Sequence, residues 1–258
     1  MPSILFEIKN SVAVITLNRP EKYNSFNRQM ALLLQKTLDD CAADKNIRAI
    51  YLTGNGKAFC AGQDLGELTG DNPPGFEVIL AEHYNPIVAK IRTIEKPVVC
   101  AVNGVAAGAG ANIALCCDVV IASSSASFIQ AFSKIGLIPD SGGTFTLPRL
   151  IGFQKASALM MLGDKVPAVE AERIGMIYKV FADEVFAEES IKIAILLSQM
   201  PTKSLAYTKL ALNASLNNSL AAQLQKEDEL QYKAAHTTDY KEGVAAFIEK
   251  RLPVFKGE

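Results

Sequence analysis

The chain has 258 residues, of which 49% are hydrophobic and 21% charged, and its 26 Lys and Arg nearly balance 27 Asp and Glu. This composition supports a buried core, while a net charge of −1 gives no general attraction to nucleic acid or to an anionic membrane surface. With two histidines in all, His83 and His236, we expect no histidine-rich metal site and no bound metal.

The five cysteines are odd in number and contain no Cys-x-x-Cys spacing. A disulfide framework or a zinc site is therefore not indicated, and we expect buried thiols in a reducing compartment. The N-terminus has no basic region followed by a long apolar run, which predicts a cytoplasmic protein. Residues 97–117 carry no charge, but Pro97 and several Gly and Asn residues interrupt them, so we expect no membrane span.

The spacing of the apolar residues predicts alternating strands and helices. Two β-branched segments, 4–8 and 12–17, predict a hairpin around Asn10 and Ser11, and Asn27 suits the N-cap of the next helix. The elements expected next are a helix to about Cys41, a strand at 49–53, a helix at about 76–93, a strand at 98–102, a short helix after a glycine turn, and a strand at 119–122. This alternation indicates an α/β fold.

The chain changes character near residue 200. Pro167 and Gly175 suit the two ends of a helix over 168–174, and a strand over 177–181 is expected after it. From Pro201 onward no strand pattern remains, and residues 202–251 predict two or three amphipathic helices. We therefore divide the chain into a core of residues 1–200 and a helical segment of residues 201–258.

The segment from Gly54 to Leu65 follows a predicted strand and contains a loop that a ligand can approach. Gly62 has no side chain, so the backbone is open there. The Gly56-Lys57 pair lacks the glycine spacing and the Ser or Thr of a phosphate-binding P-loop. An ordinary strand-to-helix connection is the alternative interpretation.

A second segment, from Asn103 to Asn112, is rich in glycine and alanine and precedes the short helix. Free N–H groups around Ala109 and Gly110, at the start of that helix, are suited to an anion or a developing oxyanion. A dinucleotide motif is not indicated, because Ile113 stands where a third glycine is needed. The alternative is that small residues only allow close packing of helix and strand.

A third segment places Asp140 in a Pro-Asp-Ser-Gly-Gly turn that leads to a helix through Leu150. Asp140 or Ser141 suits the N-cap of that helix. Alternatively, a carboxylate flanked by apolar residues has its pKa raised by loss of solvation and serves as a base. Ser141 has no nucleophile-elbow motif and no nearby histidine, so a serine nucleophile is not expected.

The chain carries, in this order, AFCAGQDL at 58–65, NGVAAGAG at 103–110, IPDSGG at 138–143 and DYKEGVAAFIEKR at 239–251. Together these segments resemble the enoyl-CoA hydratase/isomerase (crotonase) superfamily over essentially the whole chain. The resemblance implies a spiral of ββα units followed by a helical trimerisation segment. It also implies an acyl-CoA thioester substrate, no cofactor besides the coenzyme A of that substrate, and a homotrimer or a dimer of trimers.

The chemistry that the resemblance implies is stabilisation of a thioester enolate by two backbone N–H groups, which map to Gln63 and Ala109. The family's coenzyme A contacts map to the loop 61–65, whose carbonyls meet adenine, and to Phe247 and Lys250. Without the resemblance, Lys250 would be interpreted as a solvated surface charge. The expected substrate-binding and coenzyme-A-binding residues are Ala61, Gly62, Asp64, Leu65, Gly108, Gly110, Asn112, Phe132, Phe247 and Lys250.

The chain departs from the family's hydratases at their two glutamates. The corresponding positions hold Asn112 and Phe132, neither of which can act as a base at neutral pH. Asp140 remains as a single carboxylate, and one carboxylate beside an enolate site suffices to move a proton between two carbons.

The run from Phe132 to Gly143, Tyr84-Asn-Pro and the segment 103–110 are most similar to the family's phenylacetate-pathway branch. Members of that branch convert ring-1,2-epoxyphenylacetyl-CoA to oxepin-CoA and shift double bonds in enoyl-CoAs. We therefore predict an acyl-CoA isomerase with Asp140, Gln63 and Ala109 as its catalytic residues. The alternatives are a hydratase or thioesterase that uses Asp140 to activate water, and a non-catalytic coenzyme A or RNA-binding relative.

Overall fold

The computed structural model describes residues 2–69 and 73–258 and contains two β-sheets. Their strand orders are β1-β2-β3-β5-β7-β10 and β4-β6-β8-β9, and all pairings are parallel except β1 with β2 and β8 with β9. The strands are β1 (Ile4–Lys9), β2 (Val12–Leu17), β3 (Ala49–Gly54), β4 (Ala58–Cys60), β5 (Val98–Val102), β6 (Val105–Ala107), β7 (Val119–Ser123), β8 (Ser127–Ile129), β9 (Lys165–Pro167) and β10 (Lys179–Phe181).

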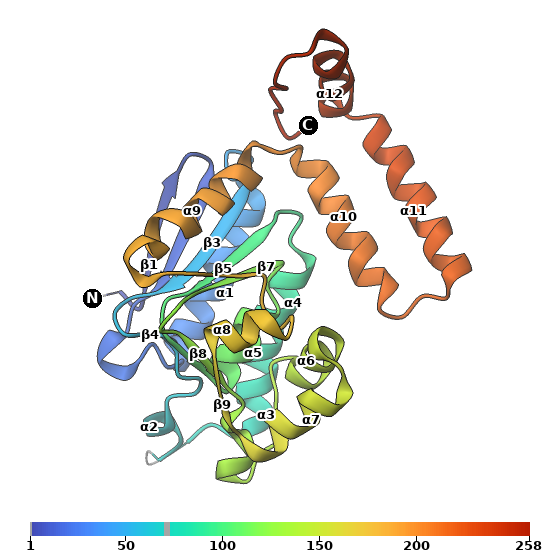
Figure 1. Ribbon diagram of the computed structural model, residues 1–258. Coiled ribbons are helices and arrows are strands. Elements are labelled where there is room, and N and C mark those ends of the chain that lie inside the picture. The colour runs from blue at the N-terminus through green and yellow to red at the C-terminus, as the bar shows by residue number, and fades with distance from the viewer. Residues whose placement is uncertain (1, 70–72) are drawn as a thin grey trace.

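Helices surround both sheets and continue beyond them to the C-terminus (Figure 1). Three are not α-helical: η1 (Pro20–Lys22) and η3 (Ala131–Ile135) are 3₁₀ turns, and η2 (Ile79–Tyr84) is a π turn. The α-helices are α1 (Arg28–Ala43), α2 (Leu65–Leu68), α3 (Phe76–Val78), α4 (Asn85–Thr93), α5 (Ala109–Leu115), α6 (Gly143–Ile151), α7 (Phe153–Leu162), α8 (Ala168–Arg173), α9 (Asp183–Gln199), α10 (Thr202–Ser215), α11 (Leu220–Ala235) and α12 (Thr238–Glu249).

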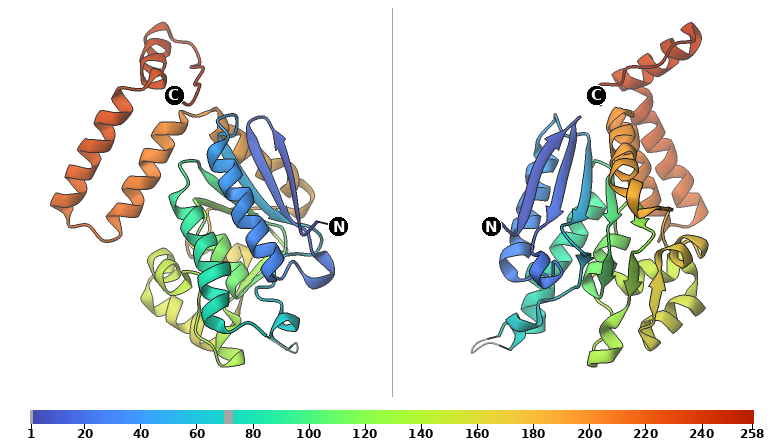
Figure 2. Two further views of the ribbon diagram at one scale, coloured as in Figure 1. Left: turned by 180° about the vertical axis from the view of Figure 1, so that it is seen from behind. Right: turned by 60° about the vertical axis from the view of Figure 1, so that its left-hand side comes forward.

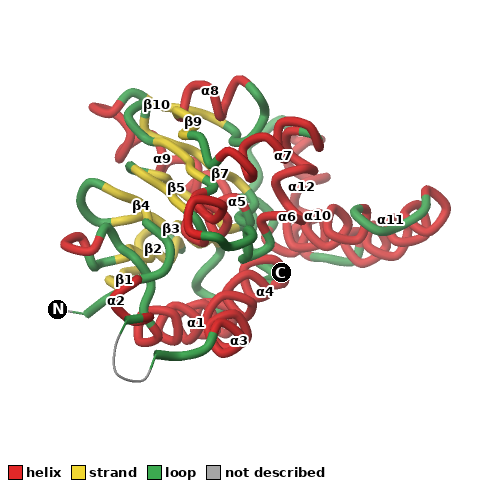
Figure 3. The backbone as a smooth tube through the Cα atoms, turned by 90° about the horizontal axis from the view of Figure 1, so that it is seen from below, coloured by secondary structure: helices red, strands yellow, loops and turns green. Residues whose placement is uncertain are grey.

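The central strands of the six-stranded sheet are buried on both faces, because their alternate side chains enter two different cores. In β3, Ile50 packs in the core beneath α1 and α4, while Tyr51 packs against α9 and its hydroxyl lies 2.7 Å from the Ser190 hydroxyl. Figure 3 shows α1 and α4 along the same side of this sheet. The continuous apolar runs in these strands follow from this double burial.

The chain repeatedly steps from the larger sheet into the smaller one. The strands β3, β5 and β7 are each followed, after a short connection, by β4, β6 and β8, which pair with one another. The predicted α/β fold, with repeated β-β-α units and a helical C-terminal region, is confirmed. The short strands of the smaller sheet lie outside the element predictions, because three residues are too few to establish an alternating pattern.

The predicted hairpin turn and one predicted helix N-cap are confirmed, and a second predicted N-cap is wrong. Asn10 and Ser11 both adopt positive φ between β1 and β2, and the Asn27 side chain caps α1 by accepting from Met30 N at 3.0 Å. The predicted N-cap of the helix after Pro139 is wrong, since α6 begins after Gly142 in the left-handed region and has no side-chain cap. The Asp140 side chain lies elsewhere, as described below.

The helix expected over 76–93 is interrupted by the π turn of η2. Pro86 has no N–H, so the carbonyl of Glu82 loses its usual helical donor. That carbonyl accepts from Gln35 Nε2 of α1 at 2.7 Å instead, and Asn85 N bonds to Leu80 O, five residues back. The interruption thus ties this helical segment to α1.

The helices α10, α11 and α12 project from the part of the chain that holds the sheets (Figures 1 and 2). They confirm the predicted helical character of residues 202–251, while a boundary between 1–200 and 201–258 stays a prediction. In residues 2–69 and 73–258, no helix has the length and apolar character that a membrane crossing requires. All five cysteines are buried, with free thiols.

Candidate active site

A cavity of about 380 Å³ lies between the loop after β4, the start of α5, η3 and the turn before α6. The smaller sheet brings these segments together because β4, β6 and β8 are neighbours in it. The cavity contains all three predicted catalytic residues. Its lining residues are Ala61, Gly62, Gln63, Leu65, Leu68, Phe76, Ile79, Tyr84, Gly108, Ala109, Ala131, Phe132, Ile135, Leu137 and Asp140.

Gln63 and Ala109 each present a backbone N–H that bonds to none of the described residues. Phe26 N donates to Gly62 O at 2.7 Å and Asp64 N donates to Phe26 O at 2.8 Å, which fixes the chain on both sides of Gln63. The Gln63 N–H therefore points away from Phe26, following the alternation of an extended chain. Ala109 is the first residue of α5, where a helix offers its N–H no partner.

Glycine lets the two N–H groups approach each other. Gly62 has φ +90°, and a Cβ there would lie 3.0 Å from Ala107 O and 3.4 Å from Ala109 N, so this loop packs on the start of α5. Gly110 is required for close packing, because a Cβ there would lie 2.4 Å from Cys60 O, and its predicted contact with substrate stays a prediction. Gly110 is not among the residues that line the cavity.

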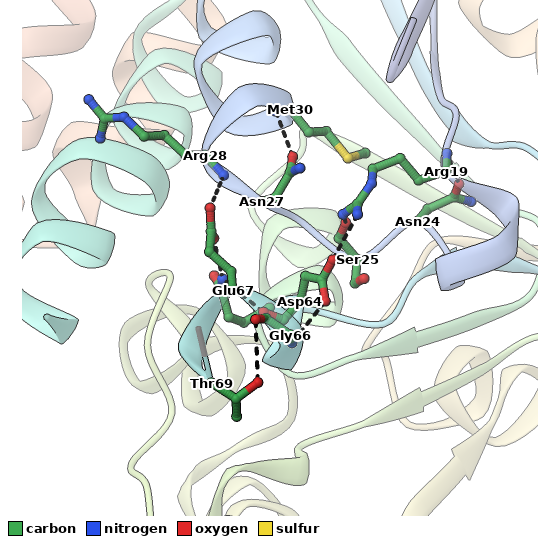
Figure 4. Close-up of polar contacts among 11 residues, drawn as sticks. Arg19, Asn24, Ser25, Asn27, Arg28, Met30, Asp64, Gly66, Glu67 and Thr69 are labelled. Atoms are coloured by element: carbon green, nitrogen blue, oxygen red, sulfur yellow. Dashed lines mark hydrogen bonds and ion pairs between the residues drawn. The ribbon is translucent and has the colours of Figure 1, made fainter. Parts of the chain in front are cut away.

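The loop that carries Gln63 is fastened by side chains (Figure 4). Arg19 Nη2 bonds to Asp64 Oδ2 at 2.7 Å, while Asp64 Oδ1 caps α2 by accepting from Gly66 N at 3.0 Å. Burial alone would raise the pKa of Asp64, but the hydrogen bonds from Arg19 and Gly66, together with the positive charges of Arg19 and Lys22, lower it below its ordinary value. Arg28 N also donates to Glu67 Oε1 at 2.8 Å. Asp64 thus holds the loop and does not line the cavity.

Asp140 is the one acidic side chain among the described residues that line the cavity. Burial raises its pKa above that of an ordinary aspartate, and hydrogen bonds from the Ser141 hydroxyl and its own backbone N–H partly oppose this. The distance from Ser141 Oγ to Asp140 Oδ1 is 2.8 Å. A carboxylate with a raised pKa is the stronger base once it is ionised.

Asn112 is fully buried behind Asp140 and does not line the cavity. Its Nδ2 donates to the Asp140 carbonyl at 2.8 Å, and its Oδ1 accepts from Gln130 Nε2 at 2.7 Å. Both polar atoms of the amide are therefore used inside the protein. The motif led us to expect a contact between Asn112 and the substrate. Because Asn112 does not line the cavity, this contact stays a prediction.

A partly buried network of hydrogen bonds supports the side chain of Gln63. Tyr84 donates to Gln63 Oε1 at 2.8 Å, and Gln63 Nε2 donates to Glu67 Oε2 at 2.8 Å. Burial raises the pKa of Tyr84 well above its ordinary value, and nearby acidic groups including Asp140 raise it further, so the phenol stays protonated. Tyr84 therefore acts as a hydrogen-bond donor.

The rest of the cavity wall is apolar. Phe132, which was expected among the substrate-binding residues, is 6% exposed and lines the cavity. Leu65, Leu68, Phe76 and Ile135 complete the apolar part together with neighbouring side chains. Such a wall accommodates an apolar acyl group and offers it few hydrogen bonds.

The tail residues expected at the coenzyme A site do not line this cavity in the single chain. Phe247 is 86% exposed on α12 and borders a groove between α10, α11 and α12. Lys250 ends α12 in the left-handed conformation. Their predicted contacts to coenzyme A stay predictions.

Three residues of the site were not identified from the sequence. Tyr84 and Glu67 hold the Gln63 side chain, and Gln130 holds Asn112. Tyr84 and Gln130 lie far along the chain from the residues they contact, and Glu67 is not part of a recognisable motif. Residue spacing therefore does not predict these contacts. Tyr84 falls in a Tyr-Asn-Pro run that contributes to the resemblance, but nothing in that run indicates which group the phenol meets.

Comparisons with known proteins identify the family of the chain. The family model described as enoyl-CoA hydratase/isomerase matches residues 7–258. The chain is 45% identical to the 1,2-epoxyphenylacetyl-CoA isomerase of Escherichia coli K12 over 100% of both chains, and 44% identical to a probable enoyl-CoA hydratase of Rhodobacter capsulatus over 99% of this chain and 98% of that protein. A crystal structure of an enoyl-CoA hydratase from Bacillus anthracis superposes with a TM-score of 0.95 at 34% identity, covering 99% of this chain and 100% of that one. The chain belongs to the enoyl-CoA hydratase/isomerase family.

Proposed function

We propose that this protein is an acyl-CoA isomerase that moves a proton between two carbons of a thioester enolate. The observation that carries the proposal is that Asp140, the one carboxylate among the described residues that line the cavity, lies in it together with the N–H groups of Gln63 and Ala109, which bond to none of the described residues. A hydratase needs groups that orient and activate water, and the family's two glutamate positions hold Asn112 and Phe132 instead.

In the proposed reaction of a 3-enoyl-CoA, the Asp140 carboxylate removes a proton from C2 of the acyl chain. The C2–H electron pair forms a dienolate whose negative charge lies on the thioester oxygen. The N–H groups of Gln63 and Ala109 bind that oxygen, and one such donor typically contributes about 3 kcal/mol to the transition state. The Asp140 carboxylic acid then returns the proton to C4, which gives the conjugated 2-enoyl-CoA.

The likeness to 1,2-epoxyphenylacetyl-CoA isomerase supports a second substrate, the ring-1,2-epoxide of phenylacetyl-CoA, which would be converted to oxepin-CoA. The apolar wall around Phe132 and Ile135 is compatible with a ring or a linear chain. We therefore propose both acyl-CoA classes as substrates, and a place in phenylacetate or fatty-acid catabolism.

A labelled substrate tests the proposal. The protein is incubated with a 3-enoyl-CoA that carries deuterium at C2, and the product is analysed by NMR and mass spectrometry. We expect a 2-enoyl-CoA with part of the deuterium at C4, because one carboxylate removes and returns the proton. A parallel incubation with a 2-enoyl-CoA tests the alternatives, because a hydratase adds water across the 2,3 double bond that a 3-enoyl-CoA lacks. Formation of 3-hydroxyacyl-CoA from the 2-enoyl-CoA without isomerisation of the 3-enoyl-CoA would support the hydratase alternative. Free CoA would support a thioesterase, and no change in either substrate would reject all three.

A further inference from the structure

The turn that carries Asp140 is backbone-strained. Ser141 has φ +51°, Gly142 has φ +74°, and Gly143 then begins α6. A non-glycine residue in the left-handed region typically costs about 1 kcal/mol or more and persists only where the surroundings impose it. The structure must therefore contain contacts that hold this turn.

Asn112 supplies such a contact from the opposite side. The Asp140 carbonyl accepts from Asn112 Nδ2 at 2.8 Å and from Gly143 N at 2.8 Å, so one bond links the turn to α5 and the other closes the turn itself. Gln130 Nε2 donates to Asn112 Oδ1 at 2.7 Å and fixes the orientation of the amide. Gln130 thus fixes the Asn112 amide, and the amide in turn fixes the turn that carries Asp140.

The Asn112 amide and the turn are packed so closely that no additional atom fits between them. A Cβ added to Gly143 would lie 2.3 Å from Asn112 Nδ2 and 2.6 Å from Asn112 Cγ. The Asn112 side chain is also completely buried. A substrate therefore cannot reach the amide unless the turn moves.

We infer that Asn112 is a positioning residue, which holds the Asp140 turn so that the carboxyl group faces the two N–H groups across the cavity. The inference rests on the proposed function for its kinetic consequences. Asn112 occupies the position that corresponds to the first glutamate of the family's hydratases. We assign it a contact with the backbone of the base, Asp140, instead of a contact with substrate or water.

The first test is Asn112→Ala, assayed with a 3-enoyl-CoA over a range of pH. We expect kcat to fall roughly 10- to 100-fold with little change in KM, because a displaced base affects the reaction more than binding. Release of the turn also hydrates Asp140, so its pKa falls toward the ordinary value and the acid limb of kcat/KM moves to lower pH. Tyr84 is the other titratable side chain that lines the cavity in the described residues, and it stays protonated across this range.

Asn213→Ala is the matched control. Asn213 Nδ2 donates to the Arg92 carbonyl at 2.8 Å, a bond of the same kind outside the cavity. We expect a comparable loss of stability and no change in kcat or in the acid limb.

A second variant, Gly143→Ala, disturbs the same contact by a substitution in the turn. Gly143→Ala places a methyl group against the Asn112 amide, so we expect a fall in kcat like that of Asn112→Ala. In the double variant the truncated residue 112 makes room for the new methyl group, so its kcat should resemble that of Asn112→Ala alone. Such non-additivity identifies a direct contact.

The opposite results overturn the inference. A raised KM with unchanged kcat would assign Asn112 to substrate binding, and an unmoved acid limb would remove it from the support of Asp140. The pKa of the Asp140 carboxyl is also measured by ¹³C NMR without substrate. This readout separates the inference from the proposed function: an inactive wild type rejects the function, while an unchanged Asp140 pKa in a folded Asn112→Ala rejects the inference.

Discussion

The two sides of the cavity are built from different parts of the chain. On one side, the N–H groups of Gln63 and Ala109 belong to the backbone and are fixed by strand pairing and by the start of α5. On the other side, the carboxyl group of Asp140 is a side chain on a strained turn. Asn112 donates to the backbone carbonyl of Asp140, and the Ser141 hydroxyl donates to its carboxylate.

This difference determines what mutation can change. A backbone N–H cannot be deleted by a substitution, so the first side is altered only by moving the main chain. The second side can be altered one hydrogen bond at a time, and each change acts on the same carboxyl group. Within one fold, the second side therefore offers the more direct route to new chemistry.

The largest effect is expected from Asp140→Asn, which removes the base and keeps its size. Loss of a general acid–base group typically lowers turnover by about 10²- to 10⁴-fold. We expect a loss in kcat of this order with KM nearly unchanged, measured by steady-state isomerisation of a 3-enoyl-CoA. Turnover equal to that of the wild type would exclude Asp140 as the base.

The backbone side is tested by Gly62→Ala. The new Cβ contacts Ala107 O and Ala109 N at a residue with φ +90°, so the loop must shift and separate the two N–H groups. We expect kcat to fall about 10- to 100-fold, less than the full loss of an oxyanion donor. Gly56→Ala is the control, because Gly56 has φ +78° but lies outside the cavity lining. Equal losses in both variants would indicate general strain.

A smaller effect is expected from Tyr84→Phe, which removes the hydrogen bond to the Gln63 side chain and keeps the ring against Phe26. A neutral hydrogen bond contributes about 1 kcal/mol, so we expect a several-fold loss of kcat, with a stability change measured by thermal unfolding. A loss as large as that of Asp140→Asn would instead make the phenol a proton donor in the reaction.

The smallest effect on turnover is expected from Ser141→Gly, which removes the hydroxyl and relieves the positive φ. The hydroxyl lowers the pKa of Asp140, so its loss raises that pKa and moves the acid limb of kcat/KM to higher pH. This shift is opposite in sign to that of Asn112→Ala. Ser141→Ala should shift the limb in the same direction with lower stability, because alanine keeps the backbone strain.

Sequence patterns predicted the larger sheet better than the site. The buried strands β2, β3 and β5 have long apolar runs, and the Asn27 cap and the Asn10-Ser11 turn carry local chemistry that needs no tertiary contact. The three-residue strands of the smaller sheet have no such pattern, although they bring the N–H groups together.

The candidate site was predicted only as far as its motifs reached. Gln63, Ala109 and Asp140 were identified by their motifs and line one cavity. The side chains that hold them come from distant segments: Tyr84 lies 21 residues from Gln63, and Asn112 lies 28 residues from Asp140. The pattern of Asp140-Ser141-Gly-Gly suggested a helix cap because the same residue types serve caps and strained turns alike.

The most direct test of the central claim is a crystal structure with a non-reactive acyl-CoA analogue bound. We expect the thioester oxygen about 3 Å from the nitrogens of both Gln63 and Ala109, with a carboxyl oxygen of Asp140 facing C2 or C4 of the acyl chain. A thioester oxygen bound elsewhere, or an acyl chain whose C2 and C4 both lie out of reach of Asp140, would contradict the claim.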